Sequence, residues 1–168
     1  MSPKKKNLSE FKTISEKLSG NITIGILVSE WNPEITESLC HGAVETLKQQ
    51  GIKESKILIH HVPGSFELPL GAQYLIEYKN VDAVICLGCI IQGETRHFEF
   101  ICQSVSQQIS RLNLDYNVPV IFGVLTTNTF QQAKERAGGK HGNKGVEAAA
   151  AAIKMLLLRD AVSTNKKN

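Results

Sequence analysis

The segment from Gln92 to His97 has the residue types and the spacing of an anion-binding active site. Gly93 lies in a short turn, and a helix is predicted to follow with Thr95 as its N-cap. The free N–H groups at the start of a helix bind anions, phosphate above all. His97 lies at the start of that helix, and its imidazole titrates near neutral pH. The segment therefore combines a cradle for a phosphate with a group that can move protons.

A buried strand and an amphipathic helix are predicted to position this segment. Residues 81–91 are apolar apart from Asp82, which is typical of a parallel strand buried on both faces. After the turn, apolar residues recur at helical spacing, at Phe98, Ile101, Cys102, Val105, Ile109 and Leu112. The turn is thus expected at the carboxyl end of a central strand. Most connections between a strand and a helix have no catalytic role, so the evidence for an active site must come from the rest of the chain.

The remaining sequence repeats the alternation of strand and helix. Three further strands are predicted, over residues 22–28, 57–62 and 118–125. Helices are predicted between and after them. This pattern indicates an α/β fold, a three-layer α/β/α sandwich around a four-stranded parallel sheet in a flavodoxin-like order.

Capping residues indicate where the other helices begin and end. Asn32 is expected to cap a helix that starts at Pro33 and ends before Gly51, and Ser65 is expected to cap the next one. A capping box at residues 129–132 begins a short helix that ends near Ala137. The chain then continues with a loop over residues 138–145 and a final helix over about 144–160.

In such a sheet, ligands bind beyond the carboxyl ends of the strands. After the segment already described, these ends carry Trp31, the segment Ser65–Phe66–Glu67, and Thr126–Thr127. Trp31 could stack on a ligand or fill the core, and Glu67 could bind a ligand or only complement a helix dipole. Arg136, on the short helix, could complete a phosphate site or be an ordinary exposed residue.

Length and charge restrict the class of protein. The 168 residues suit a single domain, predicted here as residues 21–160, with a polar arm over residues 1–20 and a basic tail over 161–168. Five of the 19 basic residues are lysines near the two ends of the sequence, and the 14 that remain are outnumbered by 16 acidic residues, which argues against a nucleic-acid binder; the five are Lys4, Lys5, Lys6, Lys166 and Lys167. The chain has no apolar run long enough to span a membrane and no signal peptide at its start, so we expect a cytoplasmic protein.

The four cysteines are predicted to be buried and reduced. Cys86 and Cys89 have the spacing of a redox pair or half of a zinc site. Residues three apart on a strand point to opposite faces, however, and the sequence offers no second pair at a suitable spacing. A metal or redox site is therefore not predicted.

Five motifs together resemble those of the lumazine synthase family. They lie in the family's order and spacing between about Ile22 and Leu158, and they are Pro63–Pro69 (PGSFELP), Leu87–Phe98 (LGCIIQGETRHF), Pro119–Thr127 (PVIFGVLTT), Gln132–Gly138 (QAKERAG) and Asn143–Gly145 (NKG). The resemblance implies a transferase of riboflavin biosynthesis. It condenses 5-amino-6-(D-ribitylamino)uracil with 3,4-dihydroxy-2-butanone 4-phosphate to give 6,7-dimethyl-8-ribityllumazine, phosphate and water, with no metal or organic cofactor.

The resemblance also implies a role for each matching residue. In the pyrimidine and ribityl site, Trp31 stacks on the ring, the ribityl chain is held by Ser65, Phe66 and Glu67, and the ring edge meets Cys89, Ile90 and Ile91. In the phosphate site, Glu94 and Thr95 hold the anion and Arg136 pairs with it. His97 moves protons, and Phe122 closes the stack from a neighbouring subunit.

Two positions depart from what the resemblance leads us to expect. Gln92 stands where a basic residue is expected, and Glu94 places a carboxylate beside the phosphate unless its side chain turns away. Two other functions therefore stay open: a non-catalytic flavodoxin-like module that binds a flavin or a phosphate, and a riboflavin synthase of the type related to this family.

The resemblance further implies that the chain assembles with copies of itself. The family forms pentamers, some of which pack into a hollow icosahedral shell. The short loop over residues 138–145 resembles that of the shell-forming members. We therefore expect two small-molecule substrates and a homo-oligomer, with no nucleic acid and no membrane as partner.

Overall fold

A four-stranded parallel sheet forms the centre of the protein. The computed structural model describes residue 18 and residues 21–164; the other residues of the predicted arm and residues 165–168 lie outside the described part of the chain. The strands lie in the order β2-β1-β3-β4, which confirms the predicted fold. Their bounds are β1 (Ile24–Ser29), β2 (Ile57–Val62), β3 (Ala83–Ile91) and β4 (Val120–Thr127).

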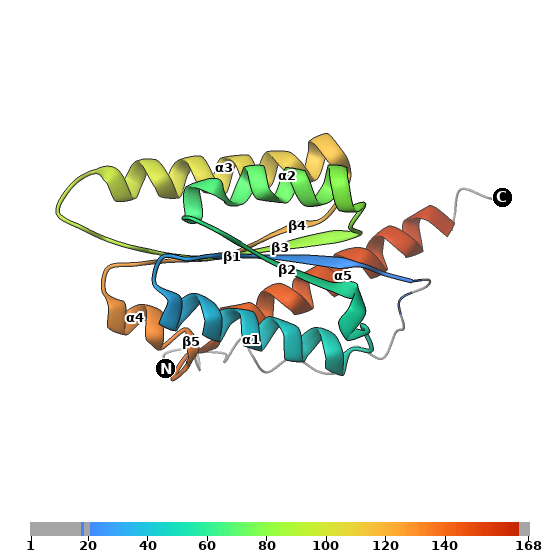
Figure 1. Cartoon of the computed structure of the whole chain (residues 1–168), viewed down its shortest axis with the longest axis horizontal. Helices are drawn as coiled ribbons and strands as arrows, with labels where there is room; N and C mark the ends of the chain where they lie inside the picture. Colours follow the sequence, from blue (N-terminus) through green and yellow to red (C-terminus); the bar gives the residue numbers. More distant parts are fainter. Residues whose placement is uncertain (1–17, 19–20, 165–168) are drawn as a thin grey trace, which may run out of the picture.

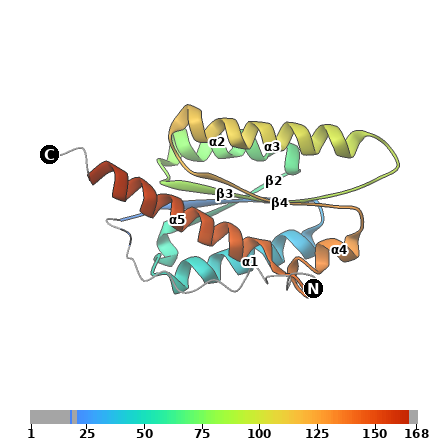
Figure 2. The same cartoon turned by 180° about the vertical axis from the view of Figure 1, so that it is seen from behind.

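Two layers of helices cover the sheet. Helices α2 (Leu68–Lys79) and α3 (His97–Tyr116) pack on one face, and α1 (Pro33–Gln49) and α5 (Lys144–Thr164) pack on the other (Figure 1). The view from behind shows α5 crossing its face of the sheet beside α1 (Figure 2). The predicted three layers are therefore present, and α5 continues past Asp160, where the final helix was expected to end.

The alternation of side chains along the strands builds two separate cores. In β1, Ile26 and Val28 pack toward α1 and α5, whereas Leu27 packs toward α2 and α3. Strand β3 behaves in the same way, since Cys86 belongs to the α2–α3 core and Cys89 to the α1–α5 core. This confirms that the two sulfurs diverge.

Burial makes the thiols of Cys86 and Cys89 unreactive. It raises the pKa of Cys86 to about 12 and that of Cys89 to about 11, so both thiols are neutral near pH 7. Within the described part of the chain, no cluster of His, Cys, Asp or Glu side chains is arranged to hold a metal ion. In the same residues, no helix has both the length and the apolar character to cross a membrane.

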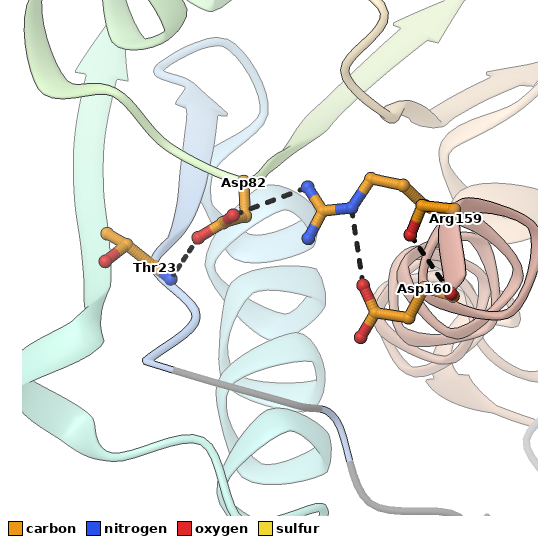
Figure 3. A network of polar contacts seen from close by, with 5 residues as sticks. Thr23, Asp82, Arg159 and Asp160 are labelled. Carbon is orange, nitrogen blue, oxygen red and sulfur yellow. Dashed lines mark hydrogen bonds and ion pairs between the residues drawn. The ribbon is translucent and has the colours of Figure 1, made fainter. Parts of the chain in front are cut away.

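The polar residue in the predicted third strand belongs to a structural network at the amino end of the sheet. Val81 and Asp82 precede β3 rather than lie in it. The Asp82 carboxylate accepts a hydrogen bond of 2.9 Å from the Thr23 backbone N–H and lies 3.4 Å from an Arg159 guanidinium nitrogen (Figure 3). Arg159 also pairs with Asp160 at 3.6 Å. The network joins the start of β1 and β3 to α5, at the edge of the sheet opposite the strand ends that carry the candidate residues.

Three predicted caps are wrong in detail. Asn32 precedes α1, but its backbone is left-handed with φ 58° and its side chain does not cap the helix. Ser65 does not cap α2 either; it opens the short 3-10 helix η2 (Ser65–Glu67) that precedes α2. Helix α3 begins at His97 rather than after Thr95, and Thr95 accepts only a long contact of 3.4 Å from the His97 backbone N–H. Asn32 is drawn away from the local cap by a tertiary contact, because its amide nitrogen donates to the backbone carbonyl of Cys89.

The segment after β4 is more structured than predicted. Thr129 does cap α4 (Phe130–Lys134), since its hydroxyl accepts a bond of 3.2 Å from the Gln132 backbone N–H. Helix α4 is shorter than expected because the chain then forms a hairpin, β5 (Ala137–Gly139) with β6 (Gly142–Asn143), inside the predicted loop.

Candidate active site

The carboxyl ends of β1, β2 and β3 surround a cleft with a volume of ≈ 760 Å³. Its lining residues lie at the end of β3, in the segments that follow β1 and β2, and in the first turns of α3. The lining residues are Trp31, Asn32, Gly64, Ser65, Phe66, Glu67, Cys89, Ile90, Ile91, His97 and Ile101. Eight of the twelve residues predicted from the sequence are thus brought together within one chain.

Trp31 lies at the mouth of the cleft and not in the core. Its side chain is 71% exposed, which excludes the alternative that it fills the interior. Phe66, on another wall, is 55% exposed. Two exposed aromatic rings beside a cleft are suited to a flat, partly polar ligand, because such rings gain most by being covered.

Gly64 allows the Glu67 carboxylate and the Trp31 indole to approach the same point of the backbone. A Cβ atom at residue 64 would lie 3.0 Å from Oε2 of Glu67 and 3.4 Å from Cδ1 of Trp31. A side chain at residue 64 would therefore press against both groups. The half-buried carboxylate can accept hydrogen bonds from hydroxyl groups of a ligand while the indole covers an adjoining ring.

Asn32 ties the first strand to the third at the floor of the cleft. Its amide nitrogen donates a hydrogen bond of 3.0 Å to the backbone carbonyl of Cys89. Sequence reasoning missed this role. The available signal was an asparagine between a strand and a proline, since asparagine tolerates the left-handed conformation that turns the chain here.

The turn before α3, for which the sequence predicts an anion cradle, is exposed and its residues 92–96 do not line the cleft. Residues 92–97 are exposed, and the Gln92 backbone N–H donates 2.8 Å to the Thr127 carbonyl, which fixes the turn to β4. Glu94 and Thr95 do not line the cleft itself. The Gln92 side chain folds onto the Gly93 carbonyl at 2.9 Å, so it does not extend toward a ligand.

His97 is the one imidazole that lines this cleft. It is exposed and opens α3, with its ring free to face the ligand side. Its neighbour Arg96 is directed elsewhere, because its guanidinium pairs with Glu99 at 3.1 Å and lies 5.5 Å from the centre of the Phe100 ring. His97 thus lies directly after the turn for which the sequence predicts an anion cradle.

Two predicted residues do not reach the cleft of their own chain. Phe122 lies in the middle of the edge strand β4, half-buried against the α2–α3 core and level with Cys86. Arg136 follows α4, and its guanidinium donates a bond of 2.9 Å to the Gln132 carbonyl. Neither lines the cleft, so one chain alone does not assemble all the groups that the sequence motifs imply.

Comparison with known proteins gives one consistent answer. Residues 21–160 match the family described as 6,7-dimethyl-8-ribityllumazine synthase. Proteins with that name are similar over nearly the whole chain. The one from Cytophaga hutchinsonii is 60% identical over 156 residues, covering 93% of this chain and 98% of the relative. The one from Porphyromonas gingivalis is 54% identical over 149 residues, covering 89% and 92%.

Proposed function

The chain belongs to the 6,7-dimethyl-8-ribityllumazine synthase family, and from this premise we propose how its residues carry out the reaction. The protein is a transferase of riboflavin biosynthesis. It condenses 5-amino-6-(D-ribitylamino)uracil with 3,4-dihydroxy-2-butanone 4-phosphate to 6,7-dimethyl-8-ribityllumazine, and releases phosphate and water. The relatives do not favour the alternative of a non-catalytic flavin-binding or phosphate-binding module.

The observation that carries the assignment of residues is the composition of the cleft. It combines an exposed indole, a buried hydroxyl, a carboxylate and an imidazole within ≈ 760 Å³. Trp31 stacks on the planar pyrimidine, and Ser65, Phe66 and Glu67 hold the ribityl chain. Ile90 and Ile91, with Cys89 behind them, meet the edge of the ring. An aromatic surface beside hydroxyl and carboxylate groups suits a planar ring that carries a chain of hydroxyls.

The phosphate of the second substrate binds at the start of α3. Glu94 and Thr95 offer backbone N–H groups and a hydroxyl there, at the positive end of a 20-residue helix. Glu94 is exposed, and we propose that its side chain turns away from the anion while its backbone N–H faces it. Arg136 supplies the neutralising guanidinium. With Gln92 folded onto its own turn, Arg136 carries most of this charge compensation.

His97 moves the protons. Imine formation between the two substrates needs a proton on the departing water. Elimination of phosphate needs removal of a proton from the four-carbon chain, and ring closure needs a further transfer. An imidazole beside both the ring site and the phosphate site can serve these steps in turn because it both donates and accepts near neutral pH.

The direct test is to incubate the protein with both substrates and follow the absorbance of the lumazine. We expect product together with an equal amount of inorganic phosphate. A protein that binds flavin or phosphate but forms no lumazine would be a binding module. A protein that instead consumes the lumazine and releases riboflavin would be a riboflavin synthase.

We propose that each site is completed by a neighbouring subunit. Phe122 and Arg136 lie outside the cleft of their own chain, whereas their proposed ligands, the pyrimidine stack and the phosphate, bind in or beside it. Phe122 lies on the edge strand of the sheet, where a second copy has access to it. A head-to-tail contact that closes into a ring gives every site one neighbour, and we propose a pentamer.

Complementation tests this shared site. Phe122→Asp and His97→Ala each have weak activity, because one loses the stack and the other loses proton transfer. When both variants are unfolded, mixed and reassembled together, some sites combine an intact His97 with an intact Phe122 from the next subunit. The activity of the mixture is therefore expected to exceed the mean of the two parents.

The control is each variant unfolded and reassembled alone, with mass spectrometry of the mixed ring to verify that both chains are present. If mixed rings form and activity remains at the mean, Phe122 does not act across an interface.

We also propose that the pentamers pack into an icosahedral shell. The hairpin β5–β6 is short, and the segment between α4 and α5 carries no insertion that would stand between pentamers. Sedimentation in low-salt, phosphate-containing buffer is expected to show a particle far larger than a pentamer. Pentamers alone under these conditions would contradict the shell. The cytoplasmic location stays a prediction from the sequence.

A further inference from the structure

Two buried serine hydroxyls at the carboxyl end of the sheet have no hydrogen-bond partner among the described residues. They belong to Ser29, the last residue of β1, which is 0% exposed, and to Ser65, the first residue of η2, which is 6% exposed. A hydroxyl that has left water without gaining a partner destabilises the folded protein, and native proteins contain few such groups. Two of them at the same end of the sheet need a physical explanation.

The alternation along β1 places the Ser29 side chain on the α2–α3 face of the sheet. Val28 packs toward α1 and α5, and Leu27 packs toward α2 and α3. Ser29 is two residues beyond Leu27, so its side chain points to the same face as Leu27. This is the face that η2 and Ser65 cover.

Gly88 in β3 relates the positions of the two serines. The paired register of β1 and β3 ends with Val28 level with Leu87, and Ser29 and Gly88 are the next residues of the two strands. A Cβ atom at Gly88 would lie 2.6 Å from the Ser65 hydroxyl oxygen. The Ser65 hydroxyl therefore occupies the space that a side chain at residue 88 would fill, next to Ser29 on the neighbouring strand.

The two serines differ in their access to the cleft. Ser65 lines it, whereas Ser29 does not. Ser29 is therefore in a layer behind Ser65 as seen from a bound ligand. A serine hydroxyl donates one hydrogen bond and accepts up to two, so Ser65 can bind a ligand hydroxyl and Ser29 at the same time.

We infer that Ser29 is a positioning residue for the ribityl chain, acting through Ser65. When a ribityl hydroxyl forms a hydrogen bond with Ser65, the Ser65 hydroxyl forms a second hydrogen bond with Ser29. The ligand, Ser65 and Ser29 are then joined in a short relay of hydrogen bonds. Linked hydroxyls polarise one another in a buried site, so the relay favours the bound state. Neither hydroxyl has a partner among the described residues, and binding of the sugar chain provides one to each. This inference rests on the proposed function, because it requires a ribityl ligand in the cleft.

The test measures affinity for two ligands that differ only in the ribityl chain. The quenching of Trp31, the one tryptophan of the chain, reports binding of 6,7-dimethyl-8-ribityllumazine and of 6,7-dimethyllumazine, which lacks the chain. Ser29→Ala is expected to raise the Kd of the ribityl ligand by roughly threefold to tenfold, the equivalent of about one hydrogen bond. The Kd of 6,7-dimethyllumazine is expected to stay unchanged.

Two further measurements separate positioning from a structural role. The thermal midpoint of Ser29→Ala in the absence of ligand should equal or exceed that of the parent, because the substitution removes an unsatisfied hydroxyl. The double variant Ser29→Ala/Ser65→Ala should bind the ribityl ligand no more weakly than Ser65→Ala alone, since Ser29 acts through Ser65. If alanine at position 29 prevents folding, Ser29→Cys, which keeps the volume and weakens the donor, should show the same selective loss.

The inference is overturned if Ser29→Ala weakens both ligands equally, weakens neither, or adds its full effect to that of Ser65→Ala. These outcomes differ from a failure of the proposed function. In that case the unmodified protein itself would form no lumazine from the two substrates.

Discussion

Replacing His97 with alanine is expected to lower the turnover number about 100-fold, near the lower end of the usual range for general acid–base catalysis. The loss is limited because attack of an amine on a ketone proceeds without a strong catalyst. Much of the acceleration comes from holding the two substrates together, and the variant keeps that contribution. His97 is exposed at the start of α3, so its removal leaves the core intact and the thermal midpoint nearly unchanged.

Steady-state kinetics with both substrates saturating measures this effect. His60→Ala is the matched control, because His60 is also exposed but lies on β2 and does not line the cleft. The control should retain full turnover. A turnover number for His97→Ala equal to that of the control would remove His97 from the mechanism.

Replacing Arg136 with alanine is expected to raise the KM for 3,4-dihydroxy-2-butanone 4-phosphate by roughly 10- to 100-fold, the range that charged hydrogen bonds supply. The KM for the pyrimidine should change far less, because the proposed partner of the guanidinium is the phosphate and not the ring. Arg136→Lys should restore only part of the affinity, since a point charge cannot reproduce the planar fork.

Inhibition by inorganic phosphate gives a second measure that does not depend on the chemical step. Its inhibition constant should rise in Arg136→Ala in parallel with the KM for the phosphorylated substrate. Arg111→Ala is the matched control, because Arg111 contacts both carboxylate oxygens of Asp115 at 2.9 Å on α3 and does not line the cleft. Equal changes in the KM of both substrates would contradict the assignment of Arg136 to the phosphate.

Both predictions concern residues that the sequence identified, but only one of the two residues lines the cleft of its own chain. His97 lines the cleft, in agreement with the prediction from the strand and turn that precede it. Arg136 stays on its own helix end, bonded to the Gln132 carbonyl. Strand order fixes which strand ends adjoin, and so brings His97 to the site. It says nothing about residues that reach a site only through a second subunit.

The sequence by itself determined the layers, the strand order and the two faces of each strand. The layers and the two faces of each strand follow from periodicity, which depends on neighbours a few residues apart. The strand order follows from the right-handed crossovers of a chain that alternates strand and helix. The bounds of β2 and the start of α1 at Pro33 agree with the prediction, and the divergence of Cys86 and Cys89 is correct for the same reason. The motifs at the strand ends also identified most of the cleft.

The tertiary structure alone decided how the polar side chains at those ends are used. Asn32 reads locally as a helix cap, but it bonds to the carbonyl of Cys89, 57 residues away, because β1 lies beside β3. Ser65 likewise reads as a cap, but packing over Gly88 buries its hydroxyl and leaves it without a partner. A polar side chain next to a helix can form a hydrogen bond with a neighbour in sequence or with a residue that only the fold brings close. The register between strands determines which partner is within reach, and no window of local sequence contains the register.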